Sequence, residues 1–192
     1  MMQIAKTPEV NLSLWEDDFV DLINKMVDFQ QTALSTENFY FDKSGWLLRF
    51  ESAVSPSNPL DPVNMASMVF YALEYLVSKE LGDGIRDAKA TDIVDALHGV
   101  IDLVYAKNRD YGNAALLPAV LVPWLDVRCG LLFRLSDKIR RLRRLYGGDT
   151  PEVAESLEDT LRDIVGYNFL LYSVIRTDEI SGKETEGESR EV

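Results

Sequence analysis

Cysteine and histidine are almost missing from this sequence, since Cys129 and His98 are the only residues of their types among 192. A single cysteine excludes an internal disulfide and a cysteine-rich zinc site, and a single histidine argues against metal sites built from several imidazoles. Cys129 has only His98 as a partner to activate it, which disfavours a cysteine nucleophile. The chemistry therefore has to depend on carboxylates, lysine, arginine and hydroxyl groups.

Long apolar runs are missing as well. No stretch reaches the roughly 18 uninterrupted apolar residues of a membrane span, and residues 1–10 lack a basic segment followed by an apolar core. We therefore expect a cytoplasmic protein without a membrane partner. The formal net charge of −12 further disfavours binding to a long nucleic acid or an acidic membrane.

Helical spacing of apolar residues is the main positive signal. It predicts an all-α, multi-helix bundle of about five helices, at 13–34, 63–81, 92–108, 126–146 and 152–176. Aromatic residues on both sides of Asp-Lys-Ser-Gly make 38–50 compatible with a small β-hairpin. The length fits one domain over residues 1–177, with its motifs within 92–177. The acidic segment 178–192 has few apolar groups, so a flexible tail is expected there.

Basic residues are concentrated in one stretch of this acidic chain. The segment 133–145 carries six Lys or Arg residues, and such a local ridge suits a compact anionic ligand better than a long polyanion. On a helical wheel, the polar side chains that border the apolar stripe of this segment are Arg134, Asp137, Lys138 and Arg141.

Three carboxylates, Glu155, Asp159 and Asp163, share one face of the last predicted helix. If the two helices run antiparallel, this acidic edge lies beside the basic edge of 133–145. Two interpretations stay open. The side chains form ordinary interhelix ion pairs, or Asp137 joins the three carboxylates in a Mg²⁺ site while the cations grip phosphate.

Residues 107–112, KNRDYG, end another predicted helix. Gly112 alone would end it, because glycine adopts the left-handed conformation without steric cost. In one interpretation Asp110 and Tyr111 only tie this helix end to the core. In the other, Lys107 contacts a phosphate, and Tyr111 stacks on a base or bonds a ligand oxygen.

Three blocks, KNRDYG (107–112), RLSDKIRRLRRL (134–145) and ESLEDTLRDIVGY (155–167), resemble in that order the nucleotide modification associated domain 1 family of phages and bacteria. Their acidic helices are similar in style to those of MazG-like all-α nucleoside triphosphate pyrophosphatases, in which Glu and Asp on neighbouring helices bind Mg²⁺. The resemblance implies a nucleotide-processing protein of a bacterial host or phage-infected cell. It further implies a role in modified-nucleotide or phage DNA metabolism through Mg²⁺-dependent hydrolysis of a (deoxy)nucleoside triphosphate.

The resemblance divides the candidate residues among three roles. Glu155 and Asp159 are the catalytic carboxylates. The Mg²⁺ ligands are Asp137, Glu155, Asp159 and Asp163. The nucleotide is bound by Lys107, Asn108, Asp110, Tyr111, Arg134, Lys138 and Arg141. The alternative is a non-catalytic module that binds a nucleotide or a protein partner through the same residues.

Two further expectations concern assembly and a second metal hypothesis. The apolar connection 113–125 and the nearly all-apolar segment 169–175 present more apolar surface than a monomer tolerates, so we expect a homo-oligomer, a dimer. Asp95, His98 and Asp102 share a polar helix face and are a second candidate site for a divalent metal. A lone histidine in such a place is more often paired with a neighbouring acid.

Overall fold

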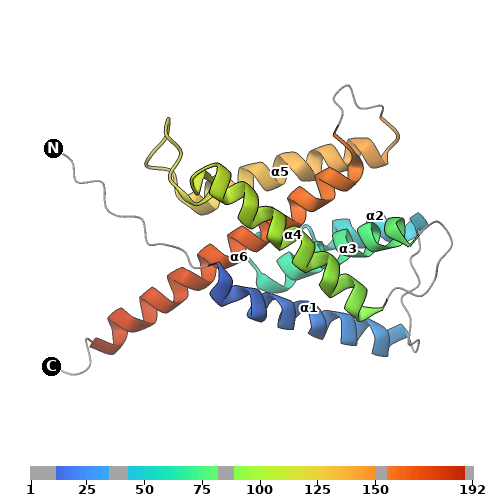
Figure 1. The fold of residues 1–192 in the computed structure, drawn as a ribbon, viewed down its shortest axis with the longest axis horizontal. Coiled ribbons are helices and arrows are strands. Elements are labelled where there is room, and N and C mark those ends of the chain that lie inside the picture. Colours follow the sequence, from blue (N-terminus) through green and yellow to red (C-terminus); the bar gives the residue numbers. More distant parts are fainter. Residues whose placement is uncertain (1–11, 35–42, 82–88, 150–154, 189–192) are drawn as a thin grey trace.

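The computed structural model describes residues 12–34, 43–81, 89–149 and 155–188, and its regular elements are helical (Figure 1). No strand occurs within these ranges, so the predicted all-α fold is confirmed. The helices are α1 (Ser13–Leu34), α2 (Lys43–Ala53), α3 (Pro62–Glu80), α4 (Ala90–Asp110), α5 (Val127–Tyr146) and α6 (Leu157–Glu188), and a 3-10 turn at Ala114–Leu116 follows α4. None of these helices is long and apolar enough to cross a bilayer.

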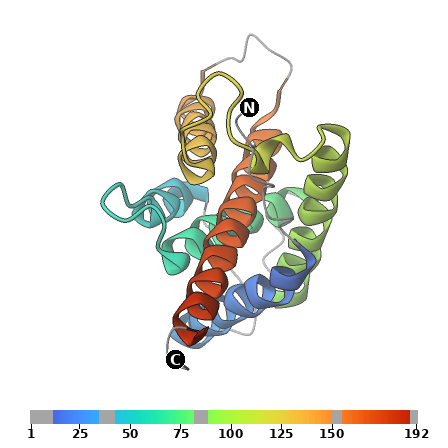
Figure 2. The same cartoon turned by 90° about the vertical axis from the view of Figure 1, so that its left-hand side faces the viewer.

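Helix α6 runs through the middle of the fold. Helices α1, α3, α4 and α5 all pack against it, and α2 packs on the outer side against α3 (Figures 1 and 2). Between Thr160 and Ser173 every residue of α6 is buried except Arg162, Asp163 and Tyr167, which keep partial exposure. A helix covered on so many sides needs apolar residues around most of its circumference, as the sequence of 169–175 predicts.

The C-terminal part of α6 continues past the expected domain boundary. The helix runs to Glu188, and in Figure 1 its red end extends beyond the bundle. Residues 178–188, expected as part of a flexible tail, therefore continue the helix in this structure. Residues 189–192 lie outside the described part of the chain.

The expected hairpin at 38–50 is wrong from residue 43 onward, because helix α2 occupies Lys43–Ala53; residues 38–42 lie outside the described ranges. Trp46, Phe50 and Ala53 are buried, and their spacing of four and three residues matches one helix face. Leu48, which would share a strand face with Trp46, is exposed. The Trp46 Nε1 donates to the Tyr71 carbonyl oxygen at 2.6 Å, which fixes α2 on α3.

Helices α4 and α6 approach each other closely at Gly166. A Cβ atom built on this glycine would lie 2.8 Å from the Val104 Cγ2 of α4. This is well inside van der Waals contact, and the valine branch lies next to the backbone and has little room to move. The missing side chain at Gly166 thus sets the distance between the two helices.

Gly166→Ala should therefore force α4 and α6 apart. We expect the free energy of unfolding to fall by about 1–3 kcal/mol, the usual cost of adding a methyl group to a well-packed core. Adding Val104→Ala to the same chain should restore part of the loss. Gly99→Ala is the matched control, because a Cβ added there on α4 would meet nothing within 4 Å; it should stabilise by roughly 0.5–1 kcal/mol through helix propensity. Urea unfolding of the four proteins measures the differences, and equal stability of the two single variants would contradict the close approach.

Candidate functional site

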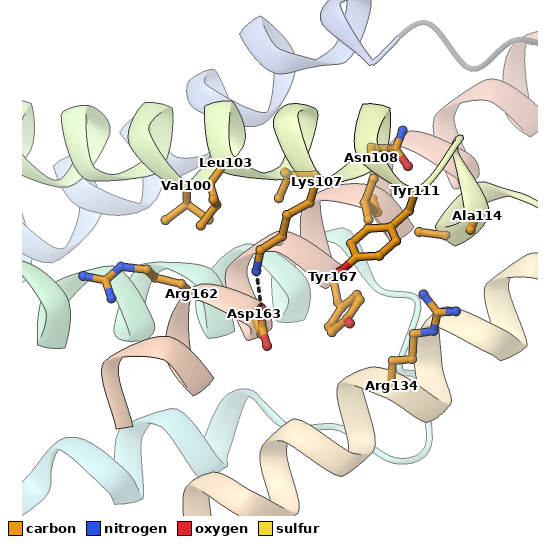
Figure 3. Close-up of a pocket in the computed structure, with 14 residues that line it drawn as sticks. Val100, Leu103, Lys107, Asn108, Tyr111, Ala114, Arg134, Arg162, Asp163 and Tyr167 are labelled. Atoms are coloured by element: carbon orange, nitrogen blue, oxygen red, sulfur yellow. Dashed lines mark hydrogen bonds and ion pairs between the residues drawn. The ribbon is translucent and has the colours of Figure 1, made fainter. Parts of the chain in front are cut away.

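A cavity of about 410 Å³ lies between α4, α5 and α6 (Figure 3). It brings together parts of all three sequence blocks. Its walls are formed by Val100, Leu103, Val104, Lys107, Asn108, Tyr111, Ala114, Ala115, Arg134, Arg162, Asp163, Gly166, Tyr167 and Leu170. The three partly exposed residues in the middle of α6 are all among them, so the cavity lies where the covering of α6 is incomplete.

Five of the predicted site residues line this cavity and six do not. Lys107, Asn108, Tyr111, Arg134 and Asp163 lie in its wall. The residues outside the wall are Asp110, Asp137, Lys138, Arg141, Glu155 and Asp159. The predicted set therefore separates into residues that line the cavity and residues that do not, although one of the latter, Lys138, bonds the wall residue Asp163.

Lys107, Tyr111 and Arg134 give the cavity its polar and aromatic character. Lys107 Nζ lies 3.3 Å from Asp163 Oδ1, the contact drawn in Figure 3. Tyr111 keeps 73% of its surface exposed, at the end of α4, and Tyr167 of α6 lines the same cavity. Arg134 enters from α5 and has no hydrogen-bond or ion-pair partner among the described residues.

Asn108 holds the end of α4 in place. It is buried, its Nδ2 donates to Asn113 Oδ1 at 2.8 Å, and its carbonyl oxygen accepts from the Asn113 N–H at 2.8 Å. Gly112 and Asn113 both have a positive φ, of 57° and 62°, a conformation that only glycine and asparagine adopt readily. This turn stops the helix at a point that leaves Tyr111 at the cavity. The structural and functional interpretations of KNRDYG thus apply to different residues of the block.

Lys138 ties α5 to α6 outside the cavity. Its Nζ lies 2.6 Å from Asp163 Oδ2 and 2.7 Å from Glu155 Oε1. Burial lowers the pKa of Lys138, but its hydrogen bonds to Asp163 and Glu155, and their charges, outweigh burial and leave the pKa above the usual 10.5. Lys138 therefore stays protonated and supplies the positive charge between these two carboxylates.

Arg141 fastens the beginning of α6. One of its terminal nitrogens donates to the Glu155 carbonyl oxygen at 3.0 Å, and the other lies 3.5 Å from Glu155 Oε2. Because these contacts bind the backbone as well as the carboxylate, Arg141 positions the chain where α6 starts. The interhelix ion pairs considered for the acidic and basic edges are thus present at Lys138 and Arg141.

The four expected Mg²⁺ ligands do not converge. Asp137 is exposed and pairs with Arg140 of its own helix at 2.8 Å. Asp159 bonds Ser156 and Arg162, while Glu155 and Asp163 bind the Lys138 ammonium. Among the residues the structure describes, no three His, Cys, Asp or Glu side chains lie close enough to share a metal ion. The positions of these four carboxylates do not fit a shared Mg²⁺ ion. The Mg²⁺ site stays a prediction that the described contacts do not support.

Asp159 and Ser156 form a capping box at the start of α6. Ser156 Oγ accepts from the Asp159 N–H at 3.0 Å, and Asp159 Oδ2 accepts from the Ser156 N–H at 3.1 Å. These bonds satisfy two backbone N–H groups that a helix start leaves open. The bonds from Ser156 hold the pKa of Asp159 below its usual 3.8. The carboxylate expected to be catalytic thus has a structural role in the described geometry.

The sequence analysis did not single out Arg162, Tyr167 or the apolar wall residues as part of a binding site. A signal was available, because Asp163, Gly166, Tyr167 and Leu170 follow the i, i+3, i+4, i+7 spacing of one helix face, and Val100, Leu103, Val104 and Lys107 do the same on α4. Two such stripes that face each other across a helix pair define a cavity wall.

His98 belongs to another cluster. Its Nδ1 lies 3.0 Å from Glu16 Oε1 of α1, and the Tyr105 hydroxyl donates to Glu16 Oε2 at 3.3 Å. Burial, together with the Glu16 charge, raises the pKa of Tyr105 to about 12. The histidine is paired with an acid from a neighbouring helix, and no metal-binding group with Asp95 and Asp102 is found among the described residues.

Comparisons of the chain with known protein families, with curated proteins and with solved structures gave no match. The resemblance to the nucleotide modification associated domain 1 family therefore rests on the three sequence blocks alone. The function has to be inferred from the cavity itself.

Ser156→Ala should lower the free energy of unfolding by about 1 kcal/mol, because the cap of α6 is lost. Ser136→Ala is the matched control: its hydroxyl bonds only the Leu132 carbonyl of its own helix, so stability should be unchanged or slightly higher. The folded-state pKa of Asp159 is lower than its usual 3.8. The ionised carboxylate therefore contributes to the free energy of unfolding above pH 3.8, and this contribution is lost as the pH falls through the lowered value. Denaturation at pH 7 and at acid pH tests this, and a neutral Ser156→Ala at pH 7 would contradict the capping role.

Lys138→Met should destabilise by about 1–3 kcal/mol, less than for a fully buried pair, because Glu155 and Asp163 lose their shared cation. Lys107→Met should cost at most about 1 kcal/mol, since Lys107 is largely exposed and Asp163 keeps Lys138. The folded-state pKa of Lys138 is raised. The ammonium therefore makes its full contribution to the free energy of unfolding below pH 10.5, and this contribution is lost as the pH rises through the raised value. Urea unfolding between pH 7 and 11 measures both variants; equal losses would show that Lys138 has no special position.

Proposed function

We propose that this protein binds a compact phosphate-bearing ligand of the nucleotide class in the cavity between α4, α5 and α6. The observation that carries the proposal is Arg134, a cation at the cavity wall without a partner among the described residues. In a chain of net charge −12, this wall carries three cations, Lys107, Arg134 and Arg162, and one carboxylate, Asp163. Lys107 is paired with Asp163 and Arg162 with Asp159 outside the wall, which leaves Arg134 as the cation that an anion can take up directly. The local charge therefore favours an anion.

The remainder of the wall favours an aromatic group beside the phosphate. Tyr111 and Tyr167 offer ring faces on which a base can stack, and Leu103, Val104 and Leu170 are apolar. A cavity of about 410 Å³ is within the usual range for small-molecule sites. A ligand with a planar base at one end and phosphate at the other satisfies both parts of the wall.

The proposed role is binding and includes no chemical step. The resemblance also implies Mg²⁺-dependent hydrolysis of a (deoxy)nucleoside triphosphate, with Glu155 and Asp159 as catalytic groups. In the described geometry Glu155 is engaged by Lys138 and Arg141, and Asp159 by Ser156. The contacts thus favour the non-catalytic alternative, and hydrolysis is an outcome that the following experiment detects separately.

The test is a calorimetric titration with dATP, dAMP, deoxyadenosine and inorganic phosphate, each with EDTA and with Mg²⁺. The nucleotides should bind more tightly than either deoxyadenosine or phosphate, with EDTA present. Arg134→Gln should weaken nucleotide binding about tenfold to a hundredfold, the loss expected for a charged hydrogen bond of about 1.5–3 kcal/mol. Tyr111→Leu should weaken it by a similar factor without lowering the melting temperature, because the ring is mostly exposed.

Arg140→Gln is the matched control, because Arg140 lies on the same helix as Arg134 and pairs with Asp137 away from the cavity. It should leave nucleotide affinity unchanged. The proposal fails if none of the nucleotides binds, or if Arg134→Gln and Arg140→Gln have equal effects. Release of pyrophosphate from dATP, seen only with Mg²⁺ and lost in Asp159→Asn, would establish the hydrolase instead.

A further inference from the structure

The connection between the 3-10 turn and α5 exposes large apolar side chains. Val120 is 93%, Leu121 88% and Trp124 80% exposed, and Leu117 is partly exposed beside them. We call the segment 117–125, which carries these four side chains, the apolar loop. Apart from the ends of the segment, where Leu116 is buried and Asp126 caps α5, little of this connection is covered by the rest of the chain.

The apolar loop has a defined conformation. The Val122 N–H donates to the Ala119 carbonyl at 3.1 Å and the Leu125 N–H to the Val122 carbonyl at 2.9 Å, which makes two consecutive turns. Pro118 and Pro123 further restrict the backbone. Apolar side chains displayed on a restricted backbone lose little conformational entropy on binding. Figure 1 shows this connection projecting from the bundle between α4 and α5.

From these observations we propose that the apolar loop is the contact between two copies of this chain. With about 150 Å² for each side chain, the lower end of the range for large ones, the exposed fractions of the four residues amount to about 450 Å². A standard interface takes about 800 Å² from each partner. The four side chains therefore supply more than half of the surface that a stable symmetric pair needs from each copy.

Charge also favours a second copy over an acidic lipid surface. Residues 114–125 contain no charged side chain, so two copies meeting at this loop bring no like charges into direct opposition. A net charge of −12 repels anionic membranes. In a pair related by a two-fold axis, each loop meets the same loop of its partner, and an uncharged apolar patch is complementary to itself.

The pairing has a consequence for the cavity. The 3-10 turn from which the loop extends supplies Ala114 and Ala115 to the cavity wall. A contact that fixes the loop therefore also fixes this side of the wall. The self-association does not depend on which ligand the cavity takes.

Sedimentation equilibrium of the full chain at about 10–100 µM tests the proposal. The wild type should show twice the chain mass of 21.7 kDa. The double substitution Leu121→Asp with Trp124→Ser should give the monomer mass with unchanged helix content. The matched control is Leu48→Asp, a similarly exposed leucine on α2, which should remain a dimer.

A cysteine cross-link adds a measurement that locates the contact. In a Cys129→Ser background, Leu121→Cys should form an intermolecular disulfide on mild oxidation, whereas Leu48→Cys should not. The proposal is overturned if the wild type sediments as a monomer, or if the dimer persists when Leu121 and Trp124 are both replaced. A monomer that pelleted with phosphatidylcholine vesicles would assign the apolar loop to a lipid surface instead.

Discussion

Burial of α6 on nearly all sides is the constraint on which the other helices depend. The apolar circumference of residues 160–173 can be removed from water only if several helices cover it, and α1, α3, α4 and α5 do so. Hydrophobic burial has no direction of its own, so the spacing of the covering helices has to come from local features. Gly166 is one of these features, because the absence of its side chain lets α4 approach α6 at the level of Val104.

The charged residues occupy the few places where α6 is not covered. There, Lys138 and Arg141 hold α5 against the beginning of α6, and Lys107 and Asp163 connect α4 with α6. A lysine ammonium and a hydrated magnesium ion both satisfy carboxylates, but the ammonium comes attached to the chain and needs no dehydration of a free ion. This explains how Glu155 and Asp163 are stabilised here by cations of the neighbouring helices, while Asp159 is held by Ser156 and Arg162 of its own segment.

The sequence was sufficient to predict the helices whose apolar spacing is regular, including α1, expected at 13–34 and found at Ser13–Leu34, and α5, expected at 126–146 and found at Val127–Tyr146. It failed at α2, because Asp-Lys-Ser-Gly resembles a turn and the burial of Trp46 and Phe50 against α3 is a tertiary effect. Lys107, Tyr111, Arg134 and Asp163 were predicted as site residues and do line one cavity, because each lies beside an apolar stripe. The capping contact of Asp159 was not predicted from its charge. The S-x-x-D spacing with Ser156 is typical of a helix cap, but the sequence does not show that the helix begins at this serine.

Asp163 is shared by two lysines, and this has a consequence for the energetics of the cavity. An anion that draws Lys107 away would ordinarily leave a carboxylate without its counter-charge. Here the other oxygen of Asp163 remains bound to Lys138, 2.6 Å away, so Lys107 can change partners while the electroneutrality of the helix interface is kept. Because Lys138 keeps the contact between α5 and α6, a change in the partner of Lys107 need not weaken the packing of these helices.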